Sequence, residues 1–256
     1  MIDQTNMVGD RPSGSVARRA ATETDRDAVS LKTHGNGAAV VALANVSYRY
    51  DLSSTWAVRQ VALRLFAGEA WALTGPSGCG KSTLLLLCAG ILRLSDGSIK
   101  INDQELAGLS ADRRADIRRA GIGLVFQFGE LVAELSLRDN VALAAELAGA
   151  SRKAALERAT ALLDRVGLSG VAEAKPGRVS GGQAQRCAIA RALVHEPRLV
   201  LADEPTGALD QRNAHNVLDL LVGLCRDQGA ALLVATHDEK VAGACDSRLS
   251  MLDGRL

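Results

Sequence analysis

The 256-residue chain combines 47% hydrophobic with 23% charged residues, a composition typical of a globular protein with a sizeable core. Its 30 basic and 29 acidic residues nearly balance and aromatic residues make up only 3%, so neither a nucleic-acid interface nor a basic lipid-binding surface is expected. Five scattered cysteines without a C-x-x-C pair indicate reduced thiols in a cytosolic protein rather than a disulfide framework.

Residues 1–39 differ in composition from the rest of the chain. They contain no aromatic residue and are rich in Gly, Ser, Thr, Asp and Arg, so we predict a disordered leader. No apolar segment typical of a signal peptide is present, and the longest apolar run, Leu84–Leu92, is well short of the roughly 18 residues of a membrane helix. A folded domain is therefore predicted over residues 40–256.

From Val40 onward strand and helix patterns alternate, which predicts an α/β fold with a largely parallel sheet. The predicted strands are Val40–Tyr50, Val61–Phe66, Ala70–Thr74, Ser98–Asn102, Ile122–Phe126, Leu199–Ala202 and Ala231–Ala235. Helices are predicted over Lys81–Arg93, Ser151–Val166 and Ala184–Val194.

A helical block separates the two halves of the predicted sheet. It is predicted as an inserted α-helical subdomain over residues 129–185, approximately. Ser136 with Asp139 resembles a capping box that starts one helix, and Gly167 is a plausible stop for another.

A glycine-rich segment between a predicted strand and helix fits the pattern G-x-x-x-x-G-K-[ST]. Glycines let backbone N–H groups turn toward phosphate oxygens, and the helix N-terminus adds positive potential. Lys81 is expected to reach the β- and γ-phosphates of a nucleotide, and Ser82 to ligate Mg²⁺. The predicted nucleotide-binding residues here are Gly75, Pro76, Ser77, Gly78, Cys79, Gly80, Lys81, Ser82 and Thr83.

Two carboxylates follow the apolar strand Leu199–Ala202. A buried strand of an open α/β sheet ends at the edge where ligands bind, so both side chains are expected near the nucleotide. Asp203 is the candidate Mg²⁺ partner and Glu204 the candidate general base for an attacking water.

A second anion-binding loop, VSGGQ, precedes the predicted helix at Ala184. Its candidate nucleotide contacts are Ser180, Gly181, Gly182 and Gln183. The chain thus carries two phosphate-binding loops but only one set of carboxylates. A head-to-tail dimer with two-fold symmetry resolves this, because each nucleotide then lies between the first loop of one copy and the second loop of its partner.

With these motifs in this order, residues 40–256 resemble the ABC ATPase family. The resemblance implies that Tyr50 stacks on adenine, with Tyr48 as the alternative. It also implies that Gln127 contacts Mg²⁺ or the attacking water, that Asp210 belongs to the D-loop at the dimer interface, and that His237 contacts the γ-phosphate. The implied fold is a P-loop NTPase core with an N-terminal antiparallel β subdomain and the inserted helices.

Finer features resemble the lipoprotein-release and macrolide-export branch of this family, with Cys79 and Ala133 as departures from it. The resemblance implies an ATPase that uses ATP and Mg²⁺, pairs with a second copy and drives a separate integral membrane permease. It would then lie at the cytoplasmic face of the inner membrane, bound through the permease. A soluble ABC ATPase of translation or DNA repair, and an ATP-driven regulator of an envelope or cell-division complex, are the alternative functions.

Overall fold

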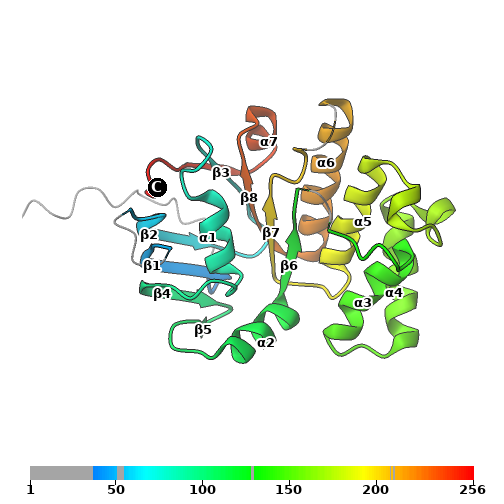
Figure 1. The fold of residues 1–256 in the computed structure, drawn as a ribbon, viewed down its shortest axis with the longest axis horizontal. Coiled ribbons are helices and arrows are strands. Elements are labelled where there is room, and N and C mark those ends of the chain that lie inside the picture. Colours follow the sequence, from blue (N-terminus) through cyan, green and yellow to red (C-terminus); the bar gives the residue numbers. More distant parts are fainter. Residues whose placement is uncertain (1–36, 51–54, 128–129, 208, 210) are drawn as a thin grey trace, which may run out of the picture. The chain divides into compact units, whose positions relative to one another are not determined.

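Two β-sheets form the framework of the fold in the computed structural model (Figure 1). The model describes residues 37–50, 55–127, 130–207, 209 and 211–256. The predicted leader, residues 1–39, lies outside the described residues except for residues 37–39.

The first sheet is antiparallel and comes mainly from the N-terminal part of the domain. Its strand order is β2-β1-β4-β5. Side chains of β2 alternate between buried and exposed positions along much of the strand, as expected when one face of a sheet packs on the core. The strands are β1 (Val41–Tyr48), β2 (Val58–Leu65), β4 (Asp96–Ile101) and β5 (Gln104–Glu105).

The second sheet is parallel and has the strand order β6-β7-β8-β3-β9. Every side chain of β3 and β8 is buried, because helices cover both faces of the sheet. Its strands are β3 (Ala70–Thr74), β6 (Ile122–Val125), β7 (Leu199–Asp203), β8 (Ala231–Thr236) and β9 (Ser247–Ser250). The antiparallel and parallel sheets together confirm the predicted fold class.

Helices pack on the parallel sheet and also form a separate group beside it, α3, α4 and α5 (Figure 1). α5 also contacts β6, and it runs on past residue 185, the predicted end of the helical insertion. In the described part of the chain, no helix is long and apolar enough to span a bilayer. The helices are α1 (Lys81–Cys88), α2 (Ala111–Gly121), α3 (Leu137–Leu147), α4 (Arg152–Arg165), α5 (Gly181–Leu193), α6 (Gln211–Gln228) and α7 (Glu239–Gly243).

Two predicted helix boundaries are wrong. α1 ends at Cys88 and not at Arg93, because Gly90 takes a left-handed φ of 64° and the amide of Ile91 turns back to the carbonyl of Leu86. α5 begins three residues earlier than predicted, at Gly181, because the Ser180 hydroxyl caps it.

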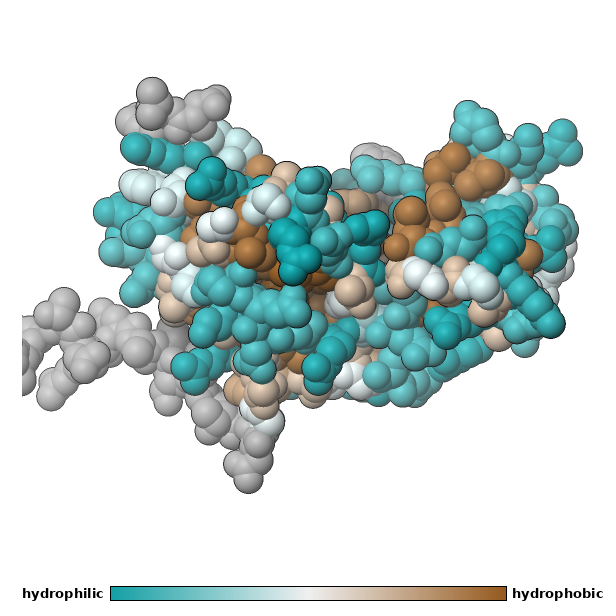
Figure 2. All heavy atoms as spheres, turned by 90° about the horizontal axis from the view of Figure 1, so that it is seen from below, coloured by the Kyte–Doolittle hydropathy of each residue, from teal (hydrophilic) through white to brown (hydrophobic). Residues whose placement is uncertain are grey.

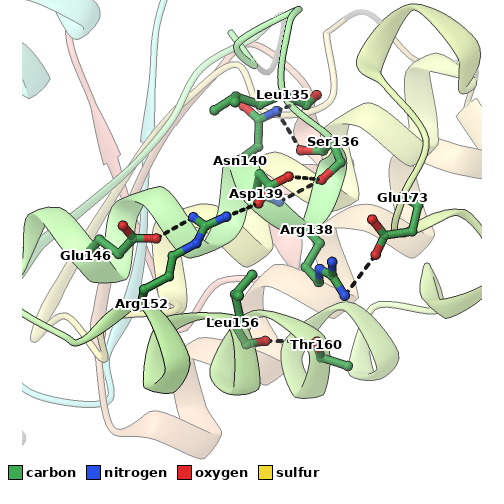
Figure 3. A network of polar contacts seen from close by, with 10 residues as sticks. All are labelled: Leu135, Ser136, Arg138, Asp139, Asn140, Glu146, Arg152, Leu156, Thr160 and Glu173. Atoms are coloured by element: carbon green, nitrogen blue, oxygen red, sulfur yellow. Dashed lines mark hydrogen bonds and ion pairs between the residues drawn. The ribbon is translucent and has the colours of Figure 1, made fainter.

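Asn140 on α3 fixes the loop that leads into this helix (Figure 3). Its side chain is almost fully buried, at 1% exposure. The amide oxygen accepts a hydrogen bond from the backbone N–H of Val132 at 2.7 Å. The amide nitrogen donates to the carbonyls of Val132 at 3.0 Å and Ser136 at 3.0 Å, with a longer bond to Leu135 at 3.3 Å. A single side chain therefore holds the backbone of the loop from Val132 to Ser136.

A second polar group lies at the surface between α3 and α4 (Figure 3). The guanidinium of Arg152 bridges the carboxylates of Asp139 and Glu146. Hydrogen bonding from Ser136 and then the bond from Arg152 hold the pKa of Asp139 below its usual value. Ser136 also accepts the amide of Asp139 and so caps α3, which confirms the predicted start of a helix here.

We predict that Asn140→Ala lowers the free energy of unfolding by about 2–4 kcal/mol, because it removes the hydrogen bonds by which a buried side chain holds the backbone of Val132 and Ser136. Chemical denaturation measures this change. Arg152→Ala is the control at the exposed network, where ion pairs contribute little, and its unfolding midpoint should stay close to that of the wild type. Equal losses in the two variants would contradict the role of Asn140.

Candidate functional site

The predicted catalytic residues meet at the carboxyl edge of the parallel sheet. The phosphate loop, residues 75–83, follows β3 directly, and Asp203 is the last residue of β7. His237 follows β8, and Gln127 comes two residues after β6. Because parallel strands end at a common edge, four segments far apart in the sequence supply side chains to one place.

The backbone of the phosphate loop takes conformations that favour glycine. Gly75, Gly78 and Gly80 have φ values of 150°, 80° and 109°. Gly80 is the N-cap of α1, so the helix begins at Lys81 and its first N–H groups have no partner within the helix. The loop and the helix N-terminus together therefore suit an anion.

Lys81 lies across the phosphate loop. Its side chain is buried, and Nζ donates hydrogen bonds to the carbonyls of Gly75 at 2.8 Å and Pro76 at 3.1 Å. The ammonium group is thereby held over the centre of the loop. An ammonium has three donors, so this geometry leaves one for a phosphate oxygen.

Asp203 and Ser82 form the candidate metal site. Burial raises the pKa of the Asp203 carboxyl, and the neighbouring charge of Glu204 raises it further. A hydrogen bond with Ser82 and the charge of Lys81 act in the opposite direction. One carboxylate with one hydroxyl beside a phosphate site is the kind of donor set that holds Mg²⁺, which keeps waters and substrate oxygens as its other ligands. The residues therefore fit the predicted ion.

Glu204 and His237 form a direct pair. Nδ1 of His237 lies 2.8 Å from Oε1 of Glu204. Glu204 has a φ of 46°, in the left-handed region, and its amide donates to the carbonyl of Ala235 at 2.9 Å. A non-glycine residue held in this region stores backbone strain, a feature that gathers at functional sites. The structure thus brings together the predicted general base, Glu204, and the histidine predicted to contact the γ-phosphate, His237.

Gln127 lies at the same edge, against the chain that follows Glu204. A Cβ at Gly207 would stand 2.8 Å from Nε2 of Gln127, so the amide group of Gln127 lies directly against Gly207. Gln185 of α5, which the sequence did not single out, is buried and donates to the carbonyl of Phe126 at 3.1 Å. It ties the helix after the second loop to the segment that carries Gln127. The signal in the sequence that could have indicated this residue was a glutamine two residues after the VSGGQ motif.

A cavity of about 460 Å³ opens beside the phosphate loop and has the size of a small-molecule site. Tyr50 is 48% exposed, its hydroxyl lies 3.1 Å from that of Thr83, and its ring meets that of Tyr48 edge-on at 5.0 Å. Tyr50 and not Tyr48 lines the cavity, as do residues that the sequence did not indicate, among them Trp56. The residues lining the cavity are Tyr50, Thr55, Trp56, Ala57, Gly78, Gly80, Lys81, Ser82 and Thr83.

The second predicted loop lies at the exposed start of α5 and does not line this cavity. Ser180 accepts the amide of Gln183 at 3.2 Å, and Gln183 Oε1 accepts the amide of Ser180 at 2.9 Å, so the two form a capping box. Ser180 and Gly181 are exposed and Gly182 is partly exposed. Asp210, predicted at the dimer interface, lies outside the described residues.

Comparison with known proteins agrees with this geometry. The family model described as ABC transporter matches residues 58–207. The chain is 48% identical over 193 residues to the lipoprotein-releasing system ATP-binding protein LolD of Gluconobacter oxydans. This match covers 75% of this chain and 83% of that protein. It is 41% identical over 221 residues to LolD of Roseobacter denitrificans, with 85% and 97% covered.

The fold also matches a solved dimeric structure, the post-hydrolysis state of the ATP-binding cassette MJ0796 bound to ADP and Pi. The TM-score is 0.77 at 35% sequence identity, with 84% of this chain and 96% of that chain covered. The chain therefore belongs to the ABC transporter family and is one of its ATPase subunits.

Proposed function

We propose that two copies of this chain bind two ATP molecules with Mg²⁺ and hydrolyse them to drive a separate membrane permease. One observation carries the proposal: Lys81, Asp203 and the Glu204–His237 pair lie at one edge of the parallel sheet. This edge combines an anion site, a candidate metal ligand and a candidate base. These are the parts that phosphoryl transfer to water needs, since positioning and charge stabilisation supply most of the catalysis.

The phosphate loop would bind the triphosphate through backbone N–H groups and Lys81. Ser82 and Asp203 would hold Mg²⁺, with Gln127 assigned to the same region. The ion supplies charge neutralisation at the phosphate oxygens. A bound cation would also stabilise the ionised form of Asp203, whose burial otherwise disfavours it. Tyr50 and Trp56 lie on the side of the cavity that we assign to the adenine base of ATP.

Glu204 is the base in this proposal. His237 engages Oε1, so Oε2 remains to accept a hydrogen bond, and then a proton, from water. His237 holds the carboxylate in one orientation and sits close enough to place its other ring nitrogen toward the γ-phosphate. Glu204 therefore acts as the catalytic residue, and His237 orients it.

A second copy would complete each nucleotide site. The Ser180 loop is exposed at a helix N-terminus, a place where anions bind, yet it stands apart from the cavity of its own chain. Ser180, Gly181, Gly182 and Gln183 would meet the nucleotide of the partner, and Asp210 would lie at the interface. The dimeric form of the ATP-binding cassette MJ0796 supports this arrangement.

The partner in the membrane would be a permease that exports or releases lipoproteins. The names of the relatives, lipoprotein-releasing system ATP-binding proteins, support this substrate class. Apolar patches interrupt the hydrophilic surface in Figure 2, and Ile91, Val132 and Leu147 are exposed apolar side chains suited to a protein partner. We place the chain at the cytoplasmic face of the inner membrane, bound through its permease.

Glu204→Gln should lower the rate of ATP hydrolysis at least ~100-fold, because the amide cannot accept the proton from water. ATP binding should persist, and a dimer should accumulate with ATP in size-exclusion chromatography. Glu196→Gln is the matched control, since Glu196 also has a left-handed φ, 54°, but lies before β7 at the opposite end of that strand. Wild-type turnover in Glu204→Gln would remove Glu204 from this role.

Lys81→Ala should weaken ATP binding ~100-fold, because charge-assisted hydrogen bonds to the phosphates are lost. Isothermal titration calorimetry with Mg·ATP measures the dissociation constant. Lys153→Ala, on the exposed start of α4, should bind as the wild type does. Tight binding by Lys81→Ala would contradict the assignment of the phosphate site.

Mixing two inactive variants tests the shared site directly. Lys81→Ala damages the phosphate loop, and Ser180→Arg should block the second loop. Half of the randomly formed pairs are mixed, and each mixed pair has one complete site, so mixing should restore about a quarter of the wild-type hydrolysis. If the mixture hydrolyses ATP no faster than each variant alone, each site lies within one chain.

A further inference from the structure

The last described segment of the chain folds into a tight turn, which we call the C-terminal turn, residues 251–255. Leu252 and Arg255 close it by exchanging backbone hydrogen bonds of 2.9 Å each. Asp253 and Gly254 both have left-handed φ values, 48° and 78°. Met251, where the turn begins, is fully buried. Nothing in the proposed reaction uses this turn.

The C-terminal turn packs against the phosphate loop. The amide of Met251 donates to the carbonyl of Thr74, the residue before the loop, at 2.7 Å. The carbonyl oxygen of Met251 lies only 2.2 Å from where a Cβ of Gly75 would stand. At the other end of the turn, the amide of Gly254 donates to the carbonyl of Cys79 at 3.0 Å. The loop is therefore held from behind at its start, beside Gly75, and at its middle residue, Cys79.

The same turn also contacts the antiparallel sheet. The carbonyl of Gly254 accepts the amide of Arg59 on β2 at 2.7 Å. A Cβ on Gly254 would lie 3.0 Å from the carbonyl oxygen of Ala57, the residue before β2. Figure 1 places the C-terminus beside this strand. One residue, Gly254, thus hydrogen-bonds to the phosphate loop through its N–H and to β2 through its C=O.

The segment between β1 and β2 of the antiparallel sheet supplies another part of the wall of the nucleotide cavity. The cavity is lined by the phosphate loop together with Tyr50, Trp56 and Ala57. We call these three residues the base wall, after the adenine base that they would contact. Ala57 approaches the loop closely as well, because a Cβ on Gly80 would stand 2.1 Å from its carbonyl oxygen. Its amide donates to the carbonyl of Tyr48 at 2.9 Å, which joins it to β1. The base wall therefore contacts the phosphate loop directly at Gly80 and the C-terminal turn at Gly254.

From these contacts we propose that the C-terminal turn is a positioning element that sets the spacing between the phosphate loop and the base wall. The inference rests on the proposed binding of ATP. A nucleotide binds both walls at once, and its affinity depends on their spacing because the second contact is intramolecular once the first is made. A ligand that consists of phosphates alone uses only the loop and is indifferent to this spacing.

Gly254→Ala tests the proposal. The added Cβ points at Ala57 and Val58 of the antiparallel-sheet side rather than at the loop, so it forces the two walls apart. We expect the dissociation constant of Mg·ATP to rise ~10-fold while that of inorganic tripolyphosphate with Mg²⁺ changes less than ~2-fold. Isothermal titration calorimetry on the full-length chain measures both constants.

Gly68→Ala is the matched control. Gly68 has nearly the same backbone conformation, with a φ of 76°, but nothing lies within 4 Å of the position of its Cβ. Both variants place an alanine at a left-handed φ and should lose stability in thermal unfolding, Gly254→Ala more so because its Cβ also meets Ala57. Only Gly254→Ala should change the ratio of the two dissociation constants, which a general loss of stability would leave unaltered.

Met251→Leu provides a second test, which is available even if Gly254→Ala does not fold. It nearly keeps the buried volume but withdraws the Cε methyl, which lies 3.0 Å from the position of a Cβ on Gly80. Because this contact supports the loop itself, both ligands should lose affinity by the same factor. If Met251→Leu binds both ligands with wild-type affinity, the turn does not support the loop.

The remaining outcomes separate the inference from the function on which it rests. If Gly254→Ala lowers the affinity for ATP and for tripolyphosphate equally, or changes neither affinity, the turn does not set the spacing and the inference fails. Equal affinity of the wild type for the two ligands would also overturn it, because the base wall would then contribute nothing. Failure of the wild type to bind ATP would instead overturn the proposed function.

Discussion

The shared direction of the strands in the second sheet is the constraint on which the rest of the structure depends. Because β3, β6, β7 and β8 run parallel, their carboxyl ends open on one edge, and the chain reaches that edge four times. A lysine, two adjacent carboxylates, a histidine and a glutamine meet there from four segments that lie far apart in the sequence. The helices that return the chain between strands bury both faces of the sheet, which keeps this edge rigid.

The two candidate anion-binding loops differ in what they already contact. The phosphate loop is braced by Lys81 from within and by neighbouring segments from behind, so its shape is set before any ligand arrives. The Ser180 loop needs only its own capping box and remains open to solvent. A preorganised loop and an exposed one suit an association in which the second closes over what the first has bound.

The sequence predicted the central strands and most of the site because these depend on local patterns. Apolar runs placed β3, β7 and β8, and Asp203 and Glu204 followed from the end of one such run. Helix ends were less predictable, since the stop at Cys88 depends on a left-handed Gly90 and the start at Gly181 on a hydroxyl cap. Trp56 and Met251 could not be assigned at all, because their roles arise from contacts between segments distant in sequence.

The hydrogen bond from Gln185 to Phe126 has a consequence for how the two nucleotides of a pair would communicate. Gln185 lies on the first turns of the helix that follows the Ser180 loop, and Phe126 directly precedes Gln127 in the sequence. The Gln185 side chain is buried, so exchange of this partly buried bond for water is costly. In the proposed pair, each copy would therefore link, through a single amide, the group facing its own triphosphate to the surface facing its neighbour's, and the two nucleotide sites would be mechanically coupled.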